Sequence, residues 1–121
     1  YSGHPMACAA GIATLDVYEE EGLLTRAGEL AKFWEDTVWG LKGSKHVIDL
    51  RVIGLVAAIE LAPREGAGGK RAFEAFTRAF DKGVLIRVTG DTIAVSPPLI
   101  VEKAQIERIV ATVGEVLQTI D

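Results

Sequence analysis

The chain has 121 residues, which is enough for one domain with its own hydrophobic core. Hydrophobic residues make up 49% of it and charged residues 25%, a composition typical of a folded globular protein and not of a disordered one. The formal net charge is −4, with no basic stripe and no interleaved aromatic residues, so we expect no binding to nucleic acid or to an anionic membrane.

The cysteine and histidine content narrows the class of protein further. Cys8 is the single cysteine, so no internal disulfide can form, which is typical of a protein from a reducing compartment. The two histidines and the acidic residues do not have the spacing of a metal site. No apolar run approaches the roughly 18 residues needed to span a bilayer. We therefore expect a cytoplasmic protein without a metal site.

The first two elements are predicted to be helices. Residues 5–20 begin with a proline, which suits the first helical turn, and end before Gly22, which is typical of a helix stop. Residues 23–41 carry apolar side chains at steps of three and four, the period of a helix with one buried face. The first helix instead has small residues around most of its circumference, so we expect it to pack against something outside this chain.

Two strands are predicted next. In residues 47–52 apolar and charged residues alternate, which places Ile48, Leu50 and Val52 on one face. Residues 55–61 are apolar on nearly both faces, which indicates a central strand of the sheet.

A third helix is predicted around Phe73, Phe76 and Phe80, which share one face. A last helix carries apolar residues at helical spacing between 106 and 120. Like the second helix, these two have a single apolar stripe, and we expect each stripe to be buried within the domain.

Two more strands are predicted between these helices. They cover residues 84–88 and 92–96 and are joined by a hairpin turn at Gly90-Asp91. The full order is ααββαββα. It predicts an α+β domain with an antiparallel sheet of about four strands and helices packed on one face.

Two other motifs resemble a phosphate-binding loop and a cysteine nucleophile, but a structural role explains each of them better. The segment 66–70 lacks the glycine and the Ser or Thr of a phosphate-binding P-loop, because Arg64 and Arg71 stand at those positions. We expect a surface loop there. Cys8 lies among alanines with no histidine or acid near it in sequence, so we expect a small packed residue and not a nucleophile.

Arg87 is the candidate binding residue. It lies just before the Gly90-Asp91 turn, and its neighbours Ile86 and Val88 face the opposite way. An arginine in such a place is commonly only solvated. The alternative is that its planar guanidinium group binds a carboxylate through two parallel hydrogen bonds. The spacing alone does not decide between these two interpretations.

Three segments together resemble the C-terminal small domain of class III, fold-type I pyridoxal-phosphate aminotransferases. YSGHPMACAAGIATLDVYEEEGLL is similar to the segment that opens that domain, and HVIDLRVIGLVAAIEL to its first strand pair. GVLIRVTGDTIAVSPPLIVEKAQIERIV is similar to its last hairpin and closing helix. The branch with the strongest resemblance is that of the omega-amino acid:pyruvate (beta-alanine:pyruvate) aminotransferases.

The resemblance implies a division of labour between this chain and a missing large domain. Residues 1–22 would be an inter-domain loop and connector helix, and residues 23–121 the C-terminal small domain. Pyridoxal 5'-phosphate and its Schiff-base lysine would belong mainly to the large domain, so this chain alone would be inactive. Arg87 matches the arginine that recognises the substrate carboxylate, while Tyr1 and Ser2 would lie near the cofactor phosphate of the partner subunit.

The implied reaction moves an amino group from an omega-amino acid, such as beta-alanine, to pyruvate. The implied partners are these small molecules, the large domain and a second subunit. Two alternatives stay open. One is another class III aminotransferase acting on 4-aminobutyrate or a diamine. The other is a stand-alone α+β binding or regulatory module, because the sequence contains almost no catalytic residues.

Overall fold

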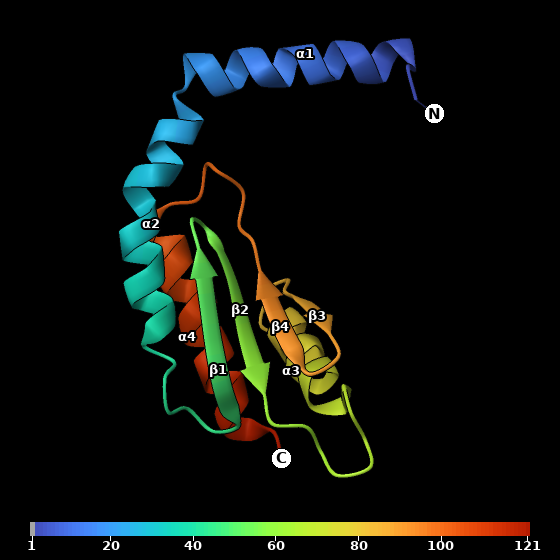
Figure 1. Ribbon diagram of the computed structural model, residues 1–121, viewed down its shortest axis with the longest axis vertical. Helices are drawn as coiled ribbons and strands as arrows, with labels where there is room; N and C mark the ends of the chain where they lie inside the picture. Colours follow the sequence, from blue (N-terminus) through green and yellow to red (C-terminus); the bar gives the residue numbers. More distant parts are fainter. Residues whose placement is uncertain (1) are drawn as a thin grey trace.

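The computed structural model describes residues 2–121, and its elements follow the order ααββαββα (Figure 1). The helices are α1 (Pro5–Glu20), α2 (Leu23–Trp39), α3 (Lys70–Asp81) and α4 (Lys103–Thr119). The strands are β1 (Val47–Ile53), β2 (Val56–Leu61), β3 (Arg87–Thr89) and β4 (Thr92–Val95). The predicted α+β class and element order are confirmed. Within residues 2–121, no helix combines the length and the apolar character needed to cross a bilayer.

The strands form one antiparallel sheet in the order β1-β2-β4-β3. Strand β2 is therefore internal, as its apolar sequence predicts. Alternate residues of the strands are buried on a single face, and α3 and α4 lie behind this face (Figure 1). The buried sheet residues are Leu50, Ala57, Ile59, Leu61, Ile93 and Val95.

The prediction that Ile48 shares a face with Leu50 and Val52 is wrong. The β1–β2 register shifts between Val47 and Asp49, which marks a β-bulge or similar irregularity. Leu50 is buried and Val52 is half-buried, but Ile48 is 59% exposed. An irregularity of one residue is enough to turn a side chain to the other face of a sheet.

Helix α3 buries a different face from the one predicted. Phe73 and Phe80 are each 60% exposed, and Phe76 is only partly buried. The residues that face the core are the small ones, Ala72, Ala75 and Ala79. Alanines at this spacing let the helix backbone lie close to the sheet, which leaves the larger phenyl rings outside.

Helix α1 has no buried residue and extends away from the sheet (Figure 1). Cys8 is exposed on it, so the prediction of a packed Cys8 is wrong for this chain. The small residues that favour close packing have no covering surface within residues 2–121. The external packing partner expected for α1 stays a prediction.

Candidate functional site

Arg87 opens β3, which lies at the edge of the sheet and pairs only with β4. Its partner in the register is Ala94. Ile86 is 5% exposed and Val88 is half-buried, whereas Arg87 is exposed, so the predicted alternation of faces is confirmed. The predicted start of this strand at residue 84 is wrong, because residues 84–86 form no ladder and are held instead by burial of Val84 and Ile86.

A groove of about 760 Å³ opens beside Arg87. Most of its lining is apolar, with contributions from Ile86, Val95 and the Pro97-Pro98 pair. Two basic residues, Arg87 and Arg108, are among the residues that line it, and no acidic residue of the described part of the chain is. This combination suits an anion with an apolar body, because the charge can meet a guanidinium while the body contacts the aliphatic walls.

On the open face of the sheet, Arg51, Ala58, Ala94 and Arg87 form one row across the four strands. The two arginines at its ends differ in their partners. Arg51 pairs with Glu60 at 2.6 Å and also with Asp49. The hydrogen bonds to Glu60 and Asp49 raise the pKa of Arg51. No carboxylate within residues 2–121 forms an ion pair with Arg87. Arg87 is therefore the available cation of this row.

The other predicted site residues lie elsewhere. Tyr1 falls outside the described residues. Ser2 is exposed in the turn that precedes α1. Figure 1 shows that this end of α1 points away from the sheet, so the chain by itself does not bring Ser2 and Arg87 together.

The described residues around Arg87 offer no lysine that could form a Schiff base with pyridoxal phosphate. No lysine lines the groove beside Arg87. Lys45 donates to a backbone carbonyl group, and Lys32 and Lys82 pair with surface carboxylates. A Schiff-base lysine needs a desolvated position or a neighbouring cation, and none of these three has such surroundings. No cluster of His, Cys, Asp and Glu within residues 2–121 could hold a metal ion.

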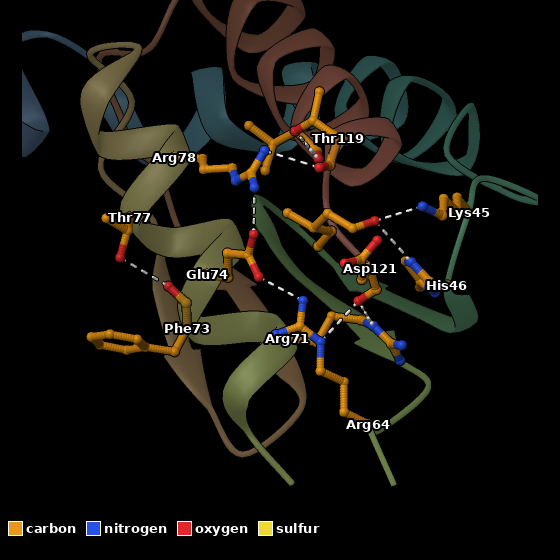
Figure 2. Close-up of polar contacts among 12 residues, drawn as sticks. Lys45, His46, Arg64, Arg71, Phe73, Glu74, Thr77, Arg78, Thr119 and Asp121 are labelled. Atoms are coloured by element: carbon orange, nitrogen blue, oxygen red, sulfur yellow. Dashed lines mark hydrogen bonds and ion pairs between the residues drawn. The ribbon is translucent and has the colours of Figure 1, made fainter. Parts of the chain in front are cut away.

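A second group of cations surrounds the end of α4 (Figure 2). The group consists of the cations Lys45, Arg64, Arg71 and Arg78, with the imidazole ring of His46 beside them. Their nitrogens lie within hydrogen-bond distance of the backbone carbonyl oxygens of residues 119–121. Lys45 Nζ, for example, lies 2.6 Å from the Ile120 oxygen and Arg71 Nε 2.6 Å from the Asp121 oxygen. The last carbonyls of a helix lack intrahelical partners, so Arg78 and Lys45 supply donors to the end of α4, and Arg64 and Arg71 bind the Asp121 carbonyl just beyond it.

Glu74 links two of these cations, Arg64 and Arg78, through ion pairs of 2.5 Å each (Figure 2). The hydrogen bond from Arg64 is the main cause of a lowered pKa for the Glu74 carboxyl group. The donors of this group therefore have partners within the fold. The group stabilises the junction of α3 and α4, and we do not regard it as a second anion site.

Sequence reasoning did not single out Arg108. It lies on the last predicted helix, where an arginine is expected simply to face solvent. It lines the groove because α4 passes beside residues 83–87, a proximity that no local pattern indicates.

Comparison with known proteins places this fold in a family. The family model described as Aminotransferase class-III matches residues 1–117, so the chain belongs to the class-III aminotransferases. The omega-aminotransferase of Caulobacter vibrioides is 54% identical over 121 residues, which are 100% of this chain and 28% of that protein. The beta-alanine–pyruvate aminotransferase of Pseudomonas aeruginosa is 41% identical over 120 residues, covering 99% of this chain and 27% of that protein.

A solved structure agrees with this placement. The omega transaminase from Pseudomonas jessenii in complex with PMP matches with a TM-score of 0.88 and 31% identity. The match covers 97% of this chain and 27% of that one. The chain therefore spans a little more than a quarter of the length of these relatives.

Proposed function

We propose that this chain is the C-terminal small domain of a pyridoxal-phosphate-dependent aminotransferase. The enzyme moves an amino group from an omega-amino acid, such as beta-alanine, to pyruvate. The observation that carries the proposal is Arg87, an exposed guanidinium group without an acidic partner in the described residues, beside an apolar groove. The names of the relatives from Caulobacter vibrioides and Pseudomonas aeruginosa support the reaction.

In this proposal Arg87 binds the carboxylate of the amino donor and orients its other end, which carries the amino group. Two parallel hydrogen bonds would fix both the position and the direction of a carboxylate. The apolar groove would contact the methylene groups of the donor and limit the access of water. The described residues thus supply recognition.

The cofactor chemistry belongs to residues outside this chain. Pyridoxal phosphate, when bound, stores the amino group between the two half-reactions. The solved relative in complex with PMP supports the use of such a cofactor. Residues 1–22 would connect the two domains and place Tyr1 and Ser2 near the cofactor phosphate of a second subunit, in a cytoplasmic oligomer. The chain without its large domain would be inactive.

A donor panel on the full-length protein tests the proposal. Beta-alanine, 4-aminobutyrate and a diamine are each supplied with pyruvate, and alanine formation is followed by chromatography. We expect beta-alanine to give the highest kcat/KM. A preference for 4-aminobutyrate or the diamine would assign the protein to another branch of the family. Absence of amino transfer with every donor would favour the binding or regulatory module.

A further inference from the structure

The strand that carries Arg87 is short and held by few contacts. Strand β3 has three residues, lies at the sheet edge and pairs with β4 alone. Burial of Ile86 fixes the strand just before Arg87. After Thr89 the chain turns through Gly90 and Asp91 into β4, so the orientation of β3 depends on how this turn is held.

Asp91 holds this turn through its side chain and its backbone. Its Oδ1 accepts a hydrogen bond from the backbone N–H of Gly69 at 2.9 Å. Its backbone carbonyl oxygen accepts one from the N–H of Leu61, at the end of β2, also at 2.9 Å. The turn is thereby fixed both to the central strand and to the loop that precedes α3.

The glycine-rich loop fits closely against the turn. A Cβ atom on Gly69 would lie 3.4 Å from the Gly90 carbonyl oxygen, and Gly69 has a φ of +78° that favours glycine. A Cβ atom on Gly68 would lie 3.6 Å from Oδ2 of Asp91. The segment 66–70, which does not fit a phosphate loop, therefore has a structural partner in the hairpin turn.

We propose that Asp91 is a positioning residue for substrate recognition: its hydrogen bond to Gly69 holds the β3–β4 turn and thereby aims Arg87 at the carboxylate of the amino donor. This inference rests on the proposed function of Arg87. Asp91 itself touches no substrate. Its effect is expected in the binding of the carboxylate and not in the chemical step.

The test compares four variants of the full-length protein, Asp91→Ala, Asp91→Asn, Arg87→Ala and the control Asp81→Ala. Asp81 is an exposed carboxylate at the end of α3. Steady-state kinetics with beta-alanine and pyruvate give kcat and KM for each. Hydrogen–deuterium exchange reports the Gly69 amide, which should exchange faster once its acceptor is removed.

We expect Asp91→Ala to raise the KM for beta-alanine about tenfold while kcat stays within about twofold. Asp91→Asn keeps an Oδ1 acceptor and should restore both KM and the slow exchange at Gly69. Asp81→Ala should match the unmodified protein.

The outcomes separate the two proposals. If Arg87→Ala raises the KM for beta-alanine but Asp91→Ala does not, the positioning role of Asp91 is wrong and the recognition role of Arg87 stands. If Arg87→Ala itself leaves KM unchanged, the proposed function of Arg87 is wrong. A fall in kcat and in thermal stability without a rise in KM for Asp91→Ala would reveal a merely structural residue and overturn the proposal.

Discussion

Arg87→Ala should remove the recognition of a carboxylate without disturbing the domain. The side chain is exposed and forms no ion pair with the described residues, so its removal breaks no internal ion pair. Ile86 and Val88, which bury or partly bury β3, are left in place. We therefore expect the thermal stability of the full-length protein to stay the same within measurement error.

The magnitude follows from the kind of bond that is lost. A carboxylate bound by a guanidinium group in an apolar groove is partly removed from water. When Arg87 is truncated to Ala, that carboxylate loses the charge that offset the loss of its water. Such losses cost about 2–5 kcal/mol, which lowers kcat/KM by about 30-fold to 5,000-fold. Arg87→Lys keeps the charge but not the planar pair of donors, and we expect an intermediate loss.

The assay measures kcat/KM for beta-alanine and for a simple amine without a carboxylate, with pyruvate as acceptor for both. The loss should be confined to beta-alanine. Arg51→Ala is the matched control, because Arg51 lies in the same row of the sheet but is already paired with Asp49 and Glu60. Equal losses for both donors, or an equal effect of Arg51→Ala, would refute the reasoning.

Two further predictions concern stability and are checked by unfolding of the full-length protein. Glu74→Gln should cost about 1 kcal/mol at pH 7, as for a small network of partly exposed ion pairs. The folded state lowers the pKa of Glu74, so the Glu74 carboxylate stabilises the fold fully above its ordinary pKa of 4.5. This stabilisation is lost as the pH falls through the lower folded-state pKa. The difference in unfolding free energy between the unmodified protein and Glu74→Gln should therefore shrink in acid. Trp34→Ala should cost about 3–5 kcal/mol, because Trp34 is fully buried. Trp34→Phe should cost much less, because it also removes an indole N–H that has no partner in the described residues; equal costs would contradict this explanation.

The sequence predicted the elements of the fold well because their signals are local. The proline at residue 5, the apolar period in residues 23–41 and the Gly90-Asp91 turn are each contained in a short window. The errors have non-local causes. The face that α3 buries depends on how closely it approaches the sheet, and the irregularity at Ile48 depends on pairing with β2.

The candidate site was predicted to a smaller extent. The pattern around Arg87 favoured a solvated arginine and left a carboxylate receptor open, and only the family resemblance favoured the second. Arg108 and Asp91 were not identified as site residues, because their contacts come from segments distant in the chain. Gly69 and Asp91, for example, are 22 residues apart, with α3 between them in the chain.

The hydrogen-bonded partners of the other arginines support Arg87 as the candidate carboxylate-binding residue. Most of them have partners within the fold: Arg26 donates to the carbonyl oxygens of residues 99 and 101, and Arg51 pairs with carboxylates. The arginines on and before α3 bind the end of α4 or Glu74. The two that have no hydrogen-bonded partner among the described residues are Arg87 and Arg108, and both line the same groove. Because the other guanidinium groups are paired internally, these two remain available to an anion from outside, as the proposed carboxylate recognition requires.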